Sequence, residues 1–246
     1  MYKQVITRWK LRILAKMPLT RPIIRLVNRG TASQNTLELF NNIRFKNRIG
    51  LGPGVDKDAQ LYNILYDYGF SFINLGPVNS TNVKTVISRL QSKPADPVIS
   101  ICIDHDHART FSMAYDFADM FSLEIPDDDI IETLNTILDT RLTYDQYKPV
   151  LLRISHKLPQ SELDRIINYC LMNGVDGIVA SQIETVKYVQ DLVGDRIPII
   201  GYGGIRTPEK AREFFNAGAD LLEITNGLMT DGPSIIGKIQ KHLDNA

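Results

Sequence analysis

Short apolar runs alternate with stretches of helical periodicity eight times along the chain, and this alternation constrains the fold more than any other feature. Strands that alternate with helices form βα units and pair in a parallel sheet. Eight strands in 246 residues predict a closed (β/α)8 barrel, the TIM barrel. The runs that we expect to be strands cover residues 49–52, 72–75, 98–103, 120–125, 150–154, 177–180, 197–201 and 221–225.

Helices are expected between these strands, at 59–68, 108–118, 130–141, 161–173, 183–193, 208–216 and 234–243, whereas the crossover at 79–96 gives the weakest helical signal. Four of them end at a glycine, which favours the left-handed C-cap: Gly69, Gly174, Gly194 and Gly218. Thr207 and Pro208 supply a cap and a first-turn proline at a helix start. The alternative is a doubly wound open sheet, but no Gly-x-Gly-x-x-Gly motif follows the first strand.

The composition excludes several classes of protein. With 43% hydrophobic and 23% charged residues, the chain can bury a full core, so it is neither disordered nor collagen-like. The 28 basic and 28 acidic residues balance, which argues against a nucleic-acid partner. Cys102 and Cys170 are too few for a disulfide scaffold and lack the spacing of a zinc site, so we expect a reducing, cytoplasmic compartment.

The N-terminal segment differs in charge from the rest of the chain. Residues 1–37 hold eight basic residues and no acidic one, which leaves a net charge of −8 on the remainder. We therefore divide the chain into a basic amphipathic helical extension at 1–34 and a barrel at 35–246. No apolar stretch of the extension is long enough for a signal peptide or a membrane span. Residues 1–29 either contact the inner membrane surface peripherally or pack as a helical plug on the barrel bottom, and a transit peptide is a further alternative.

Glycine-rich loops close the seventh and eighth strands. Gly203 and Gly204 follow the first of these strands, and Asn226 and Gly227 follow the second, each before an expected helix. Glycines let backbone amides approach an anion closely, and helix N-termini add positive partial charge. Phosphorylated ligands bind at this position in TIM barrels. The loops therefore predict a phosphate site, although tight turns alone would also favour glycine.

Several motifs resemble the dihydroorotate dehydrogenase family, in the family's order and over nearly the whole chain from Asn35. They are NRIGLGPGVDKD at 47–58, PVLLRI at 149–154, GVDG at 174–177, IPIIGYGGI at 197–205 and AGAD at 217–220. The basic extension resembles that of the membrane-associated, quinone-dependent class. The resemblance implies a flavoprotein of pyrimidine biosynthesis, an FMN-dependent dehydrogenase that oxidises dihydroorotate or a related small substrate by hydride transfer to the flavin, with a quinone as acceptor. Barrels of this type often pair, so a homodimer is expected.

The resemblance also assigns residues. It places the flavin ring near Gly52, Pro53 and Gly54 and the phosphate on the loops after the last two strands. It implies that Lys57 faces substrate and flavin and that Asp127 occupies the position of the catalytic base. The complete expected set is Asp127 and Lys57 for catalysis and Gly52, Pro53, Gly54, Arg153, Ser181, Gly203, Gly204, Asn226 and Gly227 for the cofactor.

The chain departs from the family where substrate should bind. Arg153 replaces the family lysine, Pro77 replaces a threonine, and Ser181-Gln182 replaces a threonine and an asparagine. The substrate loop between Arg89 and Pro97 is largely absent. These losses motivate an alternative function, a diverged paralogue that keeps the barrel but acts as a binding or regulatory protein. Residues 127–129 also fit a solvated helix start, and Lys57 also fits an ion pair with Asp56 or Asp58.

A further cluster follows the third strand. Asp104, His105, Asp106 and His107 could bind zinc or manganese, with His156 and Asp127 as further ligands, as in a metal-dependent lyase or hydrolase. Adjacent loop residues seldom converge on one ion, and a polar loop in which Asp106 caps the next helix explains the same residues. We therefore predict no metal.

Overall fold

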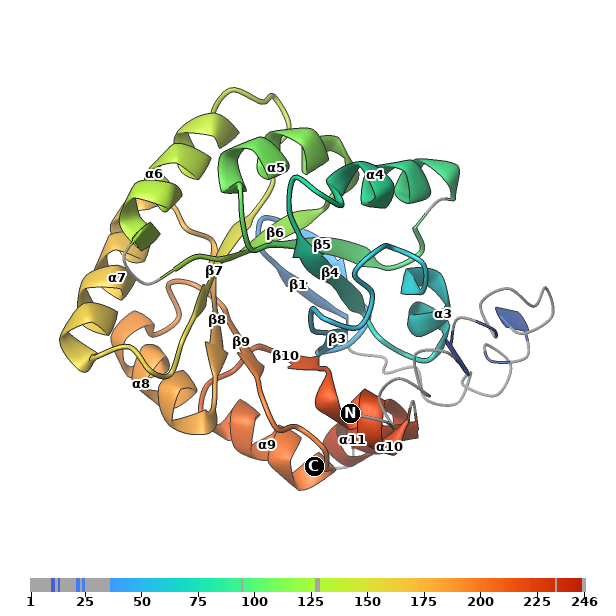
Figure 1. Ribbon diagram of the computed structural model, residues 1–246. Coiled ribbons are helices and arrows are strands. Elements are labelled where there is room, and N and C mark those ends of the chain that lie inside the picture. Colours follow the sequence, from blue (N-terminus) through green and yellow to red (C-terminus); the bar gives the residue numbers. More distant parts are fainter. Residues whose placement is uncertain are drawn as a thin grey trace.

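Eight parallel strands close into a barrel in the computed structural model, which describes residues 10, 11, 13, 21, 22, 24 and 36–244 except 94, 127, 128 and 233. The order around the barrel is β10-β3-β4-β5-β6-β7-β8-β9, so consecutive strands pair and the last strand, β10, closes the barrel on the first, β3 (Figure 1). The predicted TIM barrel is confirmed. Its strands are β3 (Ile49–Leu51), β4 (Phe72–Val78), β5 (Val98–Ile103), β6 (Met120–Glu124), β7 (Val150–Ile154), β8 (Gly177–Ser181), β9 (Ile199–Tyr202) and β10 (Leu221–Ile224).

Helices surround the barrel (Figure 1). They are α3 (Tyr62–Asp67), α4 (Val83–Ser92), α5 (His107–Ala114), α6 (Ile130–Arg141), α7 (Gln160–Asn173), α8 (Ile183–Val193), α9 (Pro208–Asn216), α10 (Asn226–Asp231) and α11 (Ser234–Asp244), and a 3-10 turn covers Tyr115–Phe117. The expected cap is present, because Thr207 Oγ1 accepts a hydrogen bond from Lys210 N at 3.2 Å. Helix α3 begins three residues later than predicted, since the Asp56 carboxylate binds the backbone N–H groups of Gln60 and Leu61 and holds them in a loop.

Every second residue of a barrel strand faces inward, so the side chains inside the barrel stack in layers. The layer near the N-terminal ends of the strands, which we call the floor, is an apolar cluster separate from the core between strands and helices. The layer above it, toward the C-terminal ends, contains the buried polar residues Asn74, Ser122, Arg153 and Glu223. The floor residues contributed by strands include Phe72, Met120, Leu151, Val179, Ile200 and Leu221.

A β-hairpin that the sequence analysis did not predict covers the floor from below. Strands β1 (Leu37–Leu39) and β2 (Ile43–Phe45) pair antiparallel. Phe40 and Phe45 of this hairpin are buried, and the Phe45 ring packs edge-on against Phe72 at a centroid distance of 5.6 Å. Within the part of the chain that the structure describes, the hairpin occupies the place proposed for a helical plug; most residues of the extension lie outside that part.

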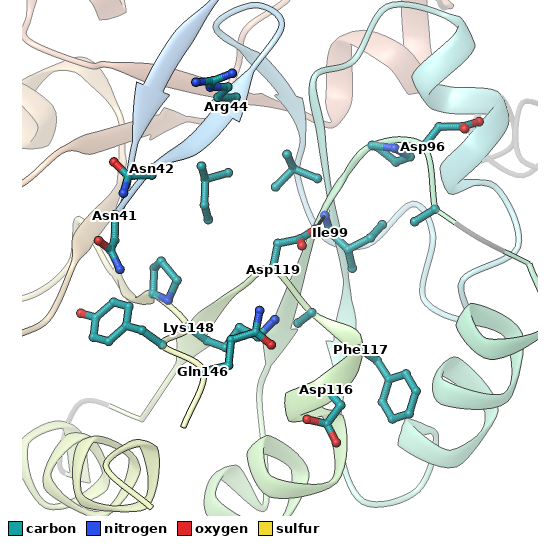
Figure 2. Close-up of a pocket in the computed structure, with 17 residues that line it drawn as sticks. Asn41, Asn42, Arg44, Asp96, Ile99, Asp116, Phe117, Asp119, Gln146 and Lys148 are labelled. Carbon is teal, nitrogen blue, oxygen red and sulfur yellow. Dashed lines mark hydrogen bonds between the residues drawn. The ribbon is translucent and has the colours of Figure 1, made fainter. Parts of the chain in front are cut away.

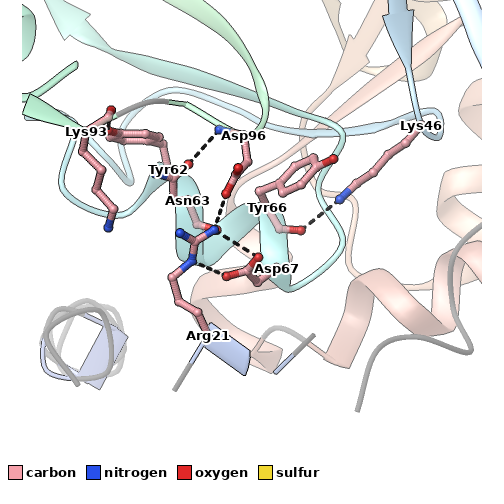
Figure 3. Close-up of polar contacts among 8 residues, drawn as sticks. All are labelled: Arg21, Lys46, Tyr62, Asn63, Tyr66, Asp67, Lys93 and Asp96. Atoms are coloured by element: carbon pink, nitrogen blue, oxygen red, sulfur yellow. Dashed lines mark hydrogen bonds and ion pairs between the residues drawn. The ribbon is translucent and has the colours of Figure 1, made fainter. Parts of the chain in front are cut away.

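The described residues of the N-terminal extension contact the barrel. Arg21 forms ion pairs with Asp67, at the end of α3, and with Asp96, just before β5 (Figure 3). The Asp67 side chain is fully buried, and Leu11 and Ile24 of the extension belong to the main hydrophobic core. This part of the extension therefore packs on the edge of the barrel formed by α3 and β5.

Among the helices that the structure describes, none combines the length and the hydropathy that crossing a bilayer requires.

Candidate active site

A cavity of about 320 Å³ lies at the C-terminal ends of the barrel strands. Active sites of TIM barrels occupy this end, so the position agrees with a catalytic role. The cavity walls come from the ends of β6, β7, β9 and β10 and from the loop after β3. Five of the residues that we predicted to bind the cofactor line it together: Pro53, Arg153, Gly203, Gly204 and Asn226.

The other four predicted cofactor residues lie next to this cavity and do not line it. A Cβ atom on Gly52 would lie 2.5 Å from Thr225 Oγ1, and one on Gly227 would lie 2.6 Å from the carbonyl oxygen of Ile205. Gly54 N donates to Gly76 O at 2.7 Å, which ties the loop after β3 to β4. Ser181 is buried at the end of β8, with its Oγ 3.2 Å from His156 Nδ1.

The loop after β9 leaves its backbone open to the cavity. Gly203 and Gly204 have φ angles of +105° and +67°, which residues other than glycine rarely adopt. A Cβ atom on Gly203 would meet its first neighbour, the backbone nitrogen of Gln182, at 3.7 Å, and one on Gly204 would meet nothing within 4 Å. The space beside both glycines is open, and the first turn of α10 begins at Asn226 on the same cavity. Backbone N–H groups in such an open, glycine-rich loop can approach an anionic ligand closely.

Arg153 and Glu223 form a buried ion pair across the polar layer. Arg153 Nη1 lies 2.8 Å from Glu223 Oε2, and the two side chains are 6% and 1% exposed. Burial, the largest single influence, lowers the pKa of Arg153, but the Glu223 carboxylate together with Cys102 and Tyr202 outweighs it, and the net effect raises this pKa. The guanidinium also lies over the Tyr202 ring, 4.6 Å from its centroid. Arg153 therefore stays charged and has a fixed orientation at the cavity wall.

Two further polar side chains complete this network. Asn74 Nδ2 donates to Glu223 Oε1 at 2.7 Å and to Ser122 Oγ at 2.9 Å. Both oxygens of the Glu223 carboxylate are therefore hydrogen-bonded. Cys102 lies nearby, and burial raises the pKa of its thiol to about 12, so the thiol remains protonated at neutral pH.

The sequence analysis did not assign a role to Glu223, Tyr202, Asn74 or Glu124. Glu223, Tyr202 and Glu124 line the cavity, and Asn74 holds Glu223. A signal for two of them was present in the sequence, because Asn74 and Glu223 interrupt strands that are otherwise apolar. A polar residue inside an apolar strand is informative because it must be satisfied when buried.

The two predicted catalytic residues differ in what the structure says of them. Lys57 is exposed on the loop after β3 and is not among the residues that line the cavity. Its acidic neighbours have other contacts, since Asp56 binds backbone N–H groups and Asp58 lies 3.6 Å from Arg89. Asp127 lies outside the described residues.

The polar cluster at residues 104–107 lies after β5, and its side chains contact separate elements of the protein. Among the described residues, no group of three or more His, Cys, Asp or Glu side chains has the arrangement of a metal centre. Two members touch each other, since His105 Nδ1 lies 3.3 Å from Asp104 Oδ2. The other contacts go outside the cluster: Asp104 accepts from Asn79, Asp106 accepts from Ser80, and His107 Nε2 lies 2.9 Å from Glu124 O. The expectation that the Asp106 side chain caps α5 is wrong. Asp106 stands at the N-cap position, but it has a φ of +49° and its carboxylate makes no capping hydrogen bond.

A larger cavity, of about 590 Å³, lies at the opposite end of the barrel (Figure 2). The turn of the β1–β2 hairpin and the segments that precede β5, β6 and β7 line it, including Asn41, Asp119 and Lys148. Residues at this end of a TIM barrel contribute to stability, whereas chemistry takes place at the other end. Asp119 follows that pattern, because its carboxylate accepts a hydrogen bond from Ile99 N at 2.7 Å. We therefore place the candidate site at the smaller cavity.

Comparisons with known proteins agree on one family. A family model for dihydroorotate dehydrogenase matches residues 172–246. Relatives named dihydroorotate dehydrogenase (quinone) occur in Christiangramia forsetii, 23% identical over 84% of this chain and 83% of the relative, and in Hamiltonella defensa, 25% identical over 82% and 85%. The crystal structure of DHODH from Eimeria tenella in complex with ferulenol has a TM-score of 0.77 at 14% identity, covering 94% of this chain and 91% of that one, which supports the fold.

Proposed function

Because this chain is a divergent relative of the dihydroorotate dehydrogenase family, of the quinone-dependent class, we propose that it is an oxidoreductase that oxidises dihydroorotate or a related small substrate with a bound flavin. One structural observation supports this proposal above the others. The glycine loops after β9 and β10 and the charged wall formed by Arg153 meet at a single cavity at the C-terminal end of the barrel.

We propose FMN as the flavin. The open space beside Gly203 and Gly204, with Asn226 at the start of α10, suits a phosphate monoester. Gly227 lets the two loops approach closely, since a Cβ atom there would lie 2.6 Å from the carbonyl oxygen of Ile205. When bound, FMN would supply the chemistry that side chains lack, namely acceptance of a hydride and later transfer of two electrons to an acceptor.

The chain's own residues would bind the flavin, orient the substrate and accept the substrate's proton. Gly52, Pro53 and Gly54 would lie along the ring, with Ser181 beside it, and Arg153 would offer its guanidinium to negative charge on the ring. Lys57 would approach the substrate from the loop after β3. Asp127, assigned from the sequence alone, would accept the proton that leaves the substrate carbon, because proton abstraction requires an acceptor within hydrogen-bond reach.

The remaining parts of the proposal concern partners and organisation. We propose a quinone as the electron acceptor, in line with the names of the relatives. The division into an extension at 1–34 and a flavin-binding barrel at 35–246, the peripheral membrane contact through residues 1–29 and the homodimer stay predictions from the sequence. Neither the comparisons nor the site favours the alternative of a binding or regulatory protein without turnover.

Absorbance of the purified protein tests the cofactor directly. We expect a flavin band in the blue and FMN in the heat-released supernatant. Asn226→Asp places a negative charge beside the proposed phosphate and should weaken FMN binding at least about tenfold. The matched control is Asn173→Asp, the same change at an exposed position at the end of α7. Dihydroorotate-dependent reduction of a quinone then tests the reaction. A protein that neither contains nor binds FMN would contradict the proposal.

A further inference from the structure

The charge of Arg153 is compensated before any ligand arrives. Arg153 comes from β7 and Glu223 from β10, and their side chains meet at 2.8 Å inside the barrel. Two charges in contact within a poorly solvated interior cancel much of each other's field at a third point. A lone guanidinium at this wall would present a full positive charge to the cavity, whereas the pair presents a dipole.

Glu223 also fixes where the guanidinium lies. Its second carboxylate oxygen is held by Asn74, and Asn74 is held by Ser122, so strands β4 and β6 anchor the carboxylate. The Tyr202 ring supports the guanidinium from the neighbouring strand β9. A guanidinium has five N–H donors. Arg153 donates from Nη1 to Glu223. Because Arg153 also lines the cavity, its other N–H donors are available to a ligand.

We propose that Glu223 is a positioning residue for the flavin site, which orients the Arg153 guanidinium toward the cavity and neutralises its charge. This inference rests on the proposed function. It implies that the site stabilises negative charge on the flavin ring less than an unpaired cation would, so the bound flavin is a weaker oxidant than it would be beside a lone arginine.

Glu223→Gln tests the inference because it removes the negative charge and keeps the length and an amide oxygen. The matched control is Glu124→Gln, which removes the same charge from the same cavity at an exposed residue that forms no ion pair with Arg153. The probe is sulfite, which adds to the ring of FMN and leaves negative charge on it. The dissociation constant of sulfite is measured from loss of the flavin absorbance band in each FMN-loaded protein.

We expect sulfite to bind Glu223→Gln at least about tenfold more tightly than the wild type and Glu124→Gln within about threefold of it. The protein without FMN supplies a second measurement. Glu223→Gln should lower its melting temperature more than Glu124→Gln does, since Arg153 loses a buried counter-charge. If Glu223→Gln does not fold, Glu223→Asp is titrated instead; it keeps the charge, lengthens the contact and should still tighten sulfite binding.

The possible failures are distinguishable. Equal sulfite affinities in the FMN-loaded wild type and Glu223 variants would overturn this inference and leave the proposed function intact. An equal gain in Glu124→Gln would also overturn it, because the effect would then be one of net charge alone. A wild-type protein that binds no FMN would overturn the proposed function, and this inference with it.

Discussion

At the scale of single residues, the polar layer of the barrel is where sequence and structure depend most closely on each other. Arg153 and Glu223 are 70 positions apart in the chain and meet because their strands both place them inside the barrel. A buried charge costs several kcal/mol of desolvation unless it has a partner of opposite charge. Each of these two residues therefore offsets the desolvation cost of the other.

Arg153→Ala should therefore lower the free energy of unfolding by about 3–5 kcal/mol, because it leaves the Glu223 carboxylate buried without its cation. Urea unfolding measures the change. The control is Arg206→Ala, which breaks the ion pair of Arg206 with Asp231 at the surface and should have only a small effect. Similar losses of unfolding free energy in the two variants would contradict the prediction, because the buried pair would then matter no more than the surface pair.

Both cysteines should be unreactive in the native protein. Each side chain is fully buried, and burial raises the pKa of both thiols to about 12. Thiol reagents react with the thiolate, so at pH 8 the folded protein should show almost no reaction and the protein in guanidinium should show two reactive thiols. Fast modification of one thiol in the native state would show that the barrel opens near Cys102 or near Cys170.

At the scale of elements, the repeated βα units were predictable and the covering elements were not. Strands 98–103 and 150–154 and helices 130–141, 183–193 and 208–216 begin and end as predicted, since periodicity and end signals coincide there. The β1–β2 hairpin was missed, because its three-residue strands and its turn through Phe40, Asn41 and Asn42, all at positive φ, carry no common turn signature. Helix α10 was missed because six residues are too few to show periodicity.

The candidate site was predictable to a similar extent. Loops after strands are readable from glycine and proline, so Pro53, Gly203, Gly204 and Asn226 were expected at one end of the barrel, where they share a cavity. The ion pair was not expected. No local pattern links residues on β7 and β10, and only closure of the barrel brings them together.

Gly227→Ala tests how tightly the loops after β9 and β10 pack. The new methyl group would lie 2.6 Å from the carbonyl oxygen of Ile205, which belongs to the backbone and cannot rotate away. The variant should unfold with about 1–3 kcal/mol less free energy and bind FMN more weakly, because the two loops must separate. Lys241→Ala, at an exposed position of the neighbouring helix α11, is the control. FMN titration and thermal unfolding report both effects, and unchanged values would show that the loops separate at no cost.

At the scale of the whole molecule, charge is divided between a basic extension and an acidic barrel. Within the described part of the extension, Arg21 joins the barrel through ion pairs with Asp67 and Asp96. Each basic residue near an anionic bilayer contributes about 1 kcal/mol to binding.

Replacing Arg8 and Arg12 by glutamine removes about 2 kcal/mol of attraction and should therefore lower the partition coefficient onto vesicles that contain anionic lipid by about thirtyfold. The control removes two positive charges from exposed positions of the barrel, Lys157→Gln and Lys187→Gln, and should change sedimentation little. Equal reductions would assign the attraction to net charge, and no reduction would remove the membrane contact from the proposal.

The separation of the barrel interior into a floor and a polar layer has a consequence for how such a protein can diverge. The hairpin phenylalanines and the floor side chains form a cluster away from the C-terminal ends of the strands. Substitutions at those ends therefore leave the aromatic packing of the floor intact. Side chains that contact the substrate can thus be replaced one after another during evolution, while the floor keeps the barrel folded. Relatives that diverged in this way would differ in the loops after the strands and would keep an apolar floor.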